Sequence, residues 1–309
     1  MPRELRIGSR GSALARWQAE HVAERLRALG VESRIIVVTT SGDRYADRSL
    51  AAIGGKELFT REIDQALATG EIDLAVHSLK DVPAERPAAL LLAAVPGRED
   101  PRDAWVAKPG ASWRSLPAGE RIGTSSLRRR AQLLALRGDL EIVPIRGNVD
   151  TRLRKWREGQ CEALVLAGAG LRRLGLEGTI TAWLEPEVMC PAAGQGALAV
   201  ECRAEDGETQ ALVAALDDAA AHTAVRAERA VLRGLGAGCQ TPVGAHAAWD
   251  GGRLRLRAVV ADADGHQLLQ AEQWGQAGPE ELGQQVAERL LAQGAAALLA
   301  TPAPAPEAP

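Results

Sequence analysis

The sequence predicts an α/β protein built from two α/β units and a small α+β unit. Short apolar runs alternate with helical periodicity through the first two-thirds of the chain, and this alternation is typical of α/β units. A second series of the same kind begins near Ala104. After about residue 217 the pattern changes to a long helix and a strand in which apolar residues alternate with arginines. A length of 309 residues fits two or three domains.

The first unit is predicted to begin with a strand at residues 5–7 and a helix whose apolar residues recur at helical spacing from Ala15 to Leu29. Ser12 stands where the N-cap of that helix belongs. The next predicted elements are a strand at 35–38, a helix near 57–69 and a strand at 74–76.

The second unit is predicted to repeat this alternation with mostly parallel strands, although no internal sequence repeat is visible. Its predicted elements are a strand from Ile122, a helix at 127–137, a strand at 142–145, a helix at 149–157 and a strand at 163–166. The apolar run at 197–201 is expected to cross back into the first unit. The last unit is predicted to contain a helix at 223–235, a strand at 254–260, a hairpin turn at Asp264-Gly265 and a helix at 280–292.

The bulk composition excludes several classes of protein. The net charge is −3, which does not favour a general nucleic-acid-binding surface, and no apolar run approaches the length of a membrane helix. No signal-peptide pattern is visible at the N-terminus, so we expect a cytoplasmic protein. Four cysteines without CxxC spacing and five scattered histidines favour neither a disulfide framework nor a bound metal.

Polar and basic side chains follow several predicted strands. Arg10 and Ser12 follow the first strand, and Lys80 and Asp81 follow the strand at 74–76. Ligands in α/β sheets bind at the carboxyl ends of strands, so these side chains are candidates for a binding site. Taken alone, each segment is also explained as a capped turn or a solvated loop.

The second unit carries a strong local excess of positive charge. Between Arg121 and Arg157 there are ten basic and three acidic residues, and arginines follow the strand ends near Thr124 and at Arg146. Arginine is suited to bidentate recognition of carboxylate or phosphate. A solvated basic face is the alternative for any one residue. A small ligand with several carboxylates fits better than nucleic acid, because Trp156 is the one aromatic residue in this stretch.

Cys239 differs from the other cysteines. It lies in the sequence GLGAGCQTPVG, where flanking glycines indicate an exposed, sharply turned loop, and an exposed thiol is a candidate nucleophile or attachment point. Cys161, Cys190 and Cys202 are expected to be buried.

Seven segments together resemble the porphobilinogen deaminase family. They occur in the family's order from residue 4 to about 245, and the C-terminal part matches more loosely; the segments are RIGSRGSALARWQ, IGGKELF, AVHSLKDVP, IGTSSLRRRAQL, IRGNVDTRL, PAAGQGALAVECR and GAGCQTPVG. The resemblance implies two doubly wound domains similar to periplasmic binding proteins and a small α+β C-terminal domain. The implied bounds are 1–97 plus 197–216, then 102–192, then 218–300, with a disordered tail at 301–309.

The resemblance also implies the reaction. Members of the family are transferases that join four porphobilinogen units head to tail with loss of ammonia, through an electrophilic azafulvene, and release hydroxymethylbilane for haem biosynthesis. The chain grows on a dipyrromethane cofactor, which the resemblance places on Cys239 through a thioether. The composition and motifs predict no metal, no nucleic acid and no membrane partner, and a monomer is expected because no assembly element is visible in the sequence. The product is expected to pass to the next enzyme of the pathway.

By the same resemblance, Asp81 is the catalytic residue that binds pyrrole N–H groups and stabilises the cationic intermediate. The residues implied to bind the cofactor besides Cys239 are Lys80, Ser12, Arg128, Arg129, Ser126, Thr124, Ser78 and Arg146. Those implied to bind substrate are Arg10, Arg146, Arg152, Arg173, Lys56, Phe59, Gln18 and Gln195, with Lys56 and Phe59 in a lid that follows Asp43.

Three positions depart from the family pattern without touching the chemistry, namely Ala13, Ala52 and Leu79. Two other functions compete with this interpretation. A non-catalytic anion-binding protein of the same two-lobed fold explains the arginines, but it does not need Cys239 or Asp81. A nucleic-acid-binding protein is opposed by the net charge and the scarce aromatic residues.

Overall fold

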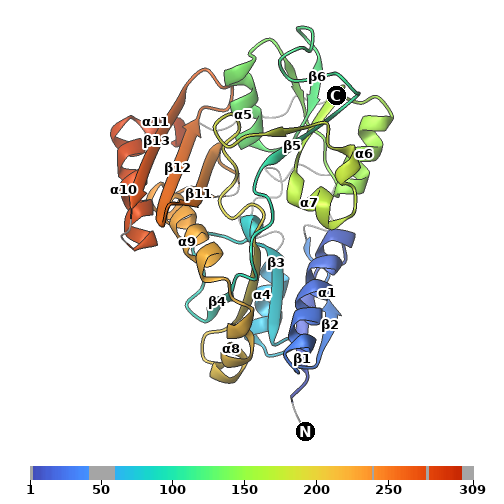
Figure 1. Ribbon diagram of the computed structural model, residues 1–309, viewed down its shortest axis with the longest axis vertical. Helices are drawn as coiled ribbons and strands as arrows, with labels where there is room; N and C mark the ends of the chain where they lie inside the picture. Colours follow the sequence, from blue (N-terminus) through green and yellow to red (C-terminus); the bar gives the residue numbers. More distant parts are fainter. Residues whose placement is uncertain (1–2, 42–59, 239, 276–277, 301–309) are drawn as a thin grey trace. The chain divides into compact units, whose positions relative to one another are not determined.

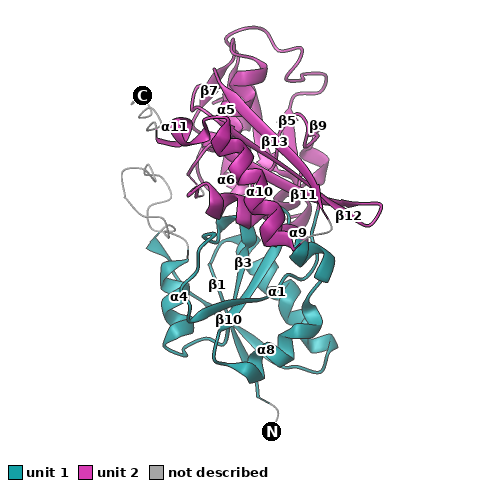
Figure 2. Ribbon diagram, turned by 90° about the vertical axis from the view of Figure 1, so that its left-hand side faces the viewer, with its two compact units in different colours: residues 1–99, 196–223 teal, residues 100–195, 224–309 magenta. Residues whose placement is uncertain are grey.

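The computed structural model describes residues 3–41, 60–238, 240–275 and 278–300. The chain divides into two compact units, which Figure 2 colours separately. Unit 1 comprises Met1–Glu99 and Gly196–Thr223, and unit 2 comprises Asp100–Gln195 and Ala224–Pro309. The second and third predicted domains both fall in unit 2, and the finer division into three domains stays a prediction.

Unit 1 contains a five-stranded sheet with the strand order β2-β1-β3-β10-β4 (Figure 1). Its strands are β1 (Leu5–Ser9), β2 (Ser33–Val37), β3 (Leu74–Ser78), β4 (Leu90–Ala94) and β10 (Leu198–Arg203). β10 joins this sheet, as predicted from the apolar run at 197–201. The sheet is mostly parallel as expected, since β1, β2, β3 and β4 run in the same direction, but β10 runs antiparallel to its neighbours β3 and β4, which was not predicted.

Helices cover both faces of this sheet. Leu74 and Val76 pack in one core cluster with residues of α1 (Ala13–Ala28), whereas Ala75 packs with residues of α4 (Arg61–Ala68). Because successive strand residues point to opposite faces, α1 and α4 lie on opposite faces. Ser12 caps α1 as predicted, since its Oγ accepts a hydrogen bond from the Ala15 N–H at 3.3 Å. The shorter elements of this unit are η1 (Leu79–Asp81), α8 (Gly207–Val213) and η3 (Ala214–Leu216).

Unit 2 contains a second five-stranded sheet with the order β7-β6-β8-β5-β9. Its strands are β5 (Asp103–Ala107), β6 (Arg121–Gly123), β7 (Glu141–Val143), β8 (Ala163–Ala167) and β9 (Ala182–Leu184). β6 is parallel to β7 and β8, while β5 is antiparallel to β8 and β9. The arrangement of directions therefore matches that of unit 1. The strand predicted at 142–145 ends at Val143, before Pro144.

Helices cover both faces of this sheet as well. Trp105 and Val165 pack with Leu133 of α5 (Leu127–Leu136), and Leu164 packs on the other face with Leu153 of α6 (Val149–Arg157). The remaining elements of this part are α7 (Gly168–Arg173) and η2 (Glu177–Thr179).

The end of unit 2 forms a three-stranded antiparallel sheet with the order β11-β12-β13. It consists of β11 (Val243–Asp250), β12 (Arg253–Ala261) and β13 (Leu268–Gly275), with α9 (Ala219–Gly234), α10 (Pro279–Ala292) and α11 (Ala295–Ala300). The hairpin predicted at Asp264-Gly265 joins β12 to β13, and Gly265 has a φ of 71°, which favours glycine. Figure 1 shows α10 beside this sheet, where it packs against β12 and β13.

Within the described ranges, no helix combines the length and the apolar character needed to cross a membrane.

Close packing of α10 on α9 depends on Gly283. A Cβ atom at this position would meet the Ala227 carbonyl oxygen and Ala230 Cβ of α9, and would approach the Val231 nitrogen to 3.1 Å. We therefore expect Gly283→Ala to lower the free energy of unfolding by about 1–3 kcal/mol, as overpacking of a core does. The measurement is urea unfolding.

The matched control is Gly207→Ala, also in a helix, where a Cβ would meet nothing within 4 Å. This variant should be neutral or up to about 1 kcal/mol more stable, because alanine has the higher helix propensity. Equal effects of the two substitutions would contradict the packing argument.

Candidate functional site

In unit 1, the predicted site residues lie where β1 and β3 end. Arg10 and Ser12 follow β1, and Ser78 is the last residue of β3. Gln18 projects from α1 and is buried, and its Nε2 donates a hydrogen bond to Ser78 Oγ at 2.7 Å. The structure therefore brings Gln18 and Ser78 together, and it joins the first helix to the end of the third strand.

Asp81 is exposed on a turn whose backbone is fixed from both sides. Leu79 is buried, its N–H donates to the Ala197 carbonyl at 3.0 Å, and its own carbonyl accepts from the Val82 N–H at 3.1 Å. Lys80 beside it is half-buried. The result is a carboxylate presented to solvent by a turn that is anchored in the core, next to a cation.

The sequence did not predict a buried ionic cluster that includes His77, the residue before Ser78. Arg86 binds Glu201 through Nε at 2.8 Å and binds both carboxylate oxygens of Asp64 at 2.6 and 2.9 Å. His77 lies against this Glu201 cluster (Asp64, His77, Arg86 and Glu201), with its Nε2 at 3.8 Å from Glu201 Oε2. Arg86 thereby ties the loop after Asp81 to α4 and β10.

The Glu201 cluster contains three side chains of metal-ligating type, but a cation already occupies it. Asp64, His77 and Glu201 place one ligand atom each within 4.8 Å of one another. The Arg86 guanidinium bonds to both carboxylates, so a metal ion would have to displace it. Burial, together with the charges of Arg86 and Arg10, lowers the pKa of His77 to about 3. Glu201 does not reverse this shift because its charge is engaged by Arg86.

In unit 2, hydroxyl groups lie between the end of β6 and the start of α5. Ser126 is the N-cap of α5, with Oγ accepting from the Arg129 N–H at 3.4 Å, and Thr124 Oγ1 accepts from the Ser126 N–H at 3.2 Å. A helix N-terminus next to a strand end is a favourable place for an anionic group.

Arg128 and Arg129 are buried around a carboxylate that sequence reasoning did not single out. Asp103 is fully buried, with Oδ2 at 2.8 Å from Arg128 Nη1 and Oδ1 at 2.8 Å from Arg129 Nη2. Gln195 donates to the same Oδ1 at 2.9 Å and to the Pro101 carbonyl at 2.7 Å. These four side chains form the Asp103 cluster. The one available signal was an acidic residue directly before an apolar strand.

The remaining predicted arginines lie after the other strands of this sheet. Arg146 follows β7, and Arg152 lies in α6 with its Nε donating to the Gly147 carbonyl at 2.7 Å. Arg173 ends α7, which follows β8. All three are half-buried, and burial lowers the pKa of Arg146. Binding of an anionic group would offset that effect, so this donor set fits a ligand with several carboxylates.

Four residues of the predicted site lie outside the described residues. They are Cys239, Lys56, Phe59 and Asp43. The other three cysteines are buried as expected, and burial raises the pKa of the Cys161 and Cys202 thiols to about 11 and that of Cys190 to about 12. Such thiols are almost wholly protonated at neutral pH, which makes them poor nucleophiles.

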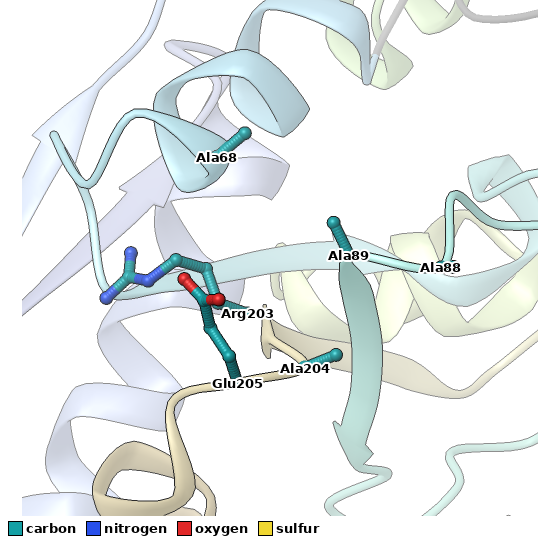
Figure 3. Close-up of a pocket in the computed structure, with 6 residues that line it drawn as sticks. All are labelled: Ala68, Ala88, Ala89, Arg203, Ala204 and Glu205. Atoms are coloured by element: carbon teal, nitrogen blue, oxygen red, sulfur yellow. The ribbon is translucent and has the colours of Figure 1, made fainter.

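A pocket of about 370 Å³ in unit 1 lies away from these residues (Figure 3). It is lined by Ala68, Ala88, Ala89, Arg203, Ala204 and Glu205. Arg203 ends β10, and in the sheet register it lies opposite Leu90, whereas Leu198 at the other end of β10 lies opposite Ser78. The pocket is therefore at the opposite edge of the sheet from Ser78 and Asp81.

Two family models match the chain. Residues 5–211 match the porphobilinogen deaminase dipyromethane cofactor binding domain, and residues 222–292 match the porphobilinogen deaminase C-terminal domain. Porphobilinogen deaminase of Roseiflexus sp. (strain RS-1) is 51% identical over 302 residues, which is 97% of this chain and 100% of that protein. The same enzyme of Thiobacillus denitrificans is 52% identical over 298 residues, covering 96% and 97% of the two chains.

Among solved structures, the methionine binding protein MetQ is similar in fold. It is 12% identical, with a TM-score of 0.45, and the match covers 69% of this chain and 89% of that one.

The buried imidazole of His77 predicts a pH dependence of stability. In the unfolded chain a histidine has a pKa of about 6.5, whereas in the folded protein the pKa of His77 is about 3. As the pH falls from 6.5 towards 3, the unfolded state binds a proton that the folded state does not. Relative to His77→Gln, the native protein should therefore lose up to about 1.4 kcal/mol of unfolding free energy per pH unit.

Urea unfolding of both proteins between pH 7.5 and 4.5 measures this difference. His266→Gln is the control, because the His266 side chain is 84% exposed. Parallel stability curves for the native protein and His77→Gln would show that the His77 imidazole gains its proton equally in both states.

Proposed function

The chain belongs to the porphobilinogen deaminase family, and from that premise we propose which residues carry the reaction. It is a hydroxymethylbilane synthase, a transferase of porphyrin biosynthesis that uses a dipyrromethane cofactor. The bound cofactor supplies the terminal pyrrole that is extended. Its carboxylates match the arginines and hydroxyl groups at the strand ends of unit 2, and this match is the observation that supports their assignment.

Each condensation exchanges one bond for another. The C–N bond of the aminomethyl group of porphobilinogen breaks, and ammonia leaves. In the loaded enzyme, the methylene carbon would then bond to the free α-carbon of the terminal pyrrole, and the proton lost from that carbon would leave with ammonia as ammonium. Positive charge develops on the substrate as ammonia departs, so a fixed carboxylate beside it lowers the barrier.

Asp81 is proposed to be that carboxylate. Its turn is anchored through Leu79, so the carboxylate needs little reorganisation as charge develops. It also accepts hydrogen bonds from pyrrole N–H groups. Ser78, held by Gln18, lies at the start of the same turn and supplies a hydroxyl group.

The arginines are proposed to bind the acetate and propionate groups of cofactor and substrate. For the cofactor these are Arg128, Arg129 and Arg146, with Ser12, Lys80, Thr124 and Ser126; for the substrate they are Arg10, Arg146, Arg152 and Arg173. Gln195 is assigned differently from the sequence-based prediction, because its amide is fully buried on Asp103 and Pro101. A supporting role for Gln195 fits these contacts better than direct contact with substrate.

Cys239 is proposed to carry the cofactor. The support is its glycine-flanked sequence, together with the burial and raised pKa of the other three thiols. We further infer a cytoplasmic monomer whose product passes to the next enzyme of the pathway. Three buried reduced cysteines are in keeping with a reducing compartment.

The intact mass of the purified protein tests the attachment. We expect a mass excess equal to two pyrrole units in the native chain and in Cys161→Ala, and no excess in Cys239→Ser. An adduct on Cys239→Ser would place the cofactor on another residue. An unmodified native chain that gains no mass on incubation with porphobilinogen would favour a non-catalytic anion-binding protein.

Substitution of Asp81 tests the catalytic role. Asp81→Asn should lower kcat by at least about 100-fold, which is the effect of removing one preorganised electrostatic group. The melting temperature should stay unchanged, because the side chain is exposed. Glu85→Gln, an exposed acidic residue in the loop that follows, is the matched control and should keep kcat within about twofold. Near-native turnover by Asp81→Asn would remove the residue from the mechanism.

A further inference from the structure

Asp103 makes unusually many charged contacts for a residue that is fully buried. Its two oxygens have separate partners: Oδ2 binds Arg128 Nη1, while Oδ1 binds the Nε and Nη2 groups of Arg129 and the amide of Gln195. Arg128 and Arg129 are themselves only 4% and 5% exposed. Backbone carbonyls complete the set, with Cys190 accepting from Arg128 at 2.7 Å and Val165 accepting from Arg129 at 3.1 Å.

The sheet topology explains why the Asp103 carboxylate lies at the ligand-binding edge, which is the end of the sheet where the parallel strands finish. β5 runs antiparallel to β8, so Asp103 at the start of β5 lies opposite Ala167 at the end of β8. Alternation along β5 puts Asp103 on the same face as Trp105, which packs with Leu133 of α5. Arg128 and Arg129 begin that helix.

The Arg128 guanidinium group is held through Nη1, and its Nε/Nη2 edge is available to bind a ligand. Both hydrogen bonds that its guanidinium makes to described residues use Nη1. The Nε and Nη2 groups lie along the other edge of the planar group. Together they form the pair of parallel donors that binds a carboxylate in bidentate fashion.

The charge balance of the Asp103 cluster also leaves room for a ligand. Within the cluster, two guanidinium groups face one carboxylate and Gln195 is neutral. A ligand carboxylate would be a second anionic partner for the pair of arginines.

We propose that Asp103 is a positioning residue that holds Arg128 and Arg129 so that the Nε/Nη2 edge of Arg128 binds one carboxylate of the dipyrromethane cofactor. This inference rests on the proposed function, because it takes the pyrrole carboxylates as the ligands. Asp103 touches neither cofactor nor substrate and acts through the two arginines.

Asp103→Asn is the most selective test of this role. An amide offers one oxygen and one NH₂ group, so in either orientation an N–H group faces a guanidinium N–H group and one arginine loses its acceptor. The shape of the side chain is kept. The arginine that is released moves away from its binding geometry, and cofactor loading falls.

Asp73→Asn is the control, because Asp73 is also a buried aspartate that pairs with two arginines, and it lies in unit 1 at the start of a strand, away from the strand ends of the proposed site. It is 1% exposed and binds Arg6 and Arg3 at 2.8 Å. It directly precedes β3, whereas the residues of the proposed site follow that strand. Both substitutions should lower the melting temperature, because each leaves an arginine poorly paired. The effect of Asp73→Asn should be the smaller one, since Arg3 and Arg6 are 32% exposed.

The readout is the rate at which apo-protein incubated with porphobilinogen gains the mass of the dipyrromethane, followed by mass spectrometry below the melting temperature of each variant. Asp103→Asn should load about tenfold more slowly or worse, as expected when a binding group is misplaced, and Asp73→Asn should stay within about twofold of the native rate. Native-rate loading by Asp103→Asn would overturn the proposal, and so would an equal loss in Asp73→Asn.

A double-mutant cycle separates positioning from general damage and covers the case in which Asp103→Asn folds poorly. Arg128→Gln/Asp103→Asn removes one charge of each sign. If Asp103 acts through Arg128, its substitution should cost much less in the Arg128→Gln background than in the native one. Additive losses would overturn the proposal. A native apo-protein that gains no adduct at all would instead contradict the proposed function.

Discussion

One antiparallel strand in each five-stranded sheet determines how the candidate site is built. β10 begins opposite Ser78 at the end of β3, and β5 begins with Asp103 opposite Ala167 at the end of β8. The start of an antiparallel strand thus lies at the edge where its parallel neighbours finish. Ligand groups in α/β sheets bind at that edge, so residues far apart in the chain meet there without long loops. The Asp103 cluster and the anchor between Leu79 and Ala197 both follow from this constraint.

The two sheets use the same topology for different electrostatic purposes. In unit 1, the edge presents an exposed carboxylate, Asp81, on an anchored turn, and in the Glu201 cluster two carboxylates share one guanidinium group. In unit 2, the corresponding edge carries arginines in excess of carboxylates. A carboxylate that faces a developing cation and cations that face resident carboxylates are both required when an anionic pyrrole chain grows through a cationic substrate.

Periodicity was sufficient to predict most elements, and the resemblance supplied the candidate residues. Ser12, the hairpin at Asp264-Gly265 and the helix at 149–157 were all found as predicted, because caps, turns and amphipathic faces are local signals. No local sequence signal determines the direction of a strand in its sheet. β5 and β10 are apolar runs like their neighbours, and nothing in their sequences indicates that they run antiparallel. The two sheets share one strand order and one pattern of directions, but this similarity is not visible in the sequence, because strand pairing is not encoded by a local signal. Asp103 and Arg86 were missed because their partners are distant in the chain, Glu201 lying 115 residues from Arg86.

The ratio of two buried guanidinium groups to one carboxylate is itself informative about binding. Two arginines buried without a counter-ion would carry a desolvation cost that the fold must bear before any ligand arrives. Two arginines with two carboxylates would be stable, but they would offer an anionic ligand no net attraction. The Asp103 cluster is intermediate between these two cases, because one carboxylate fixes both arginines in the folded chain. The neutral amide of Gln195 fills a remaining acceptor site on Asp103 without changing that balance. The stability of this edge and its affinity for a carboxylate are therefore set by the same residue.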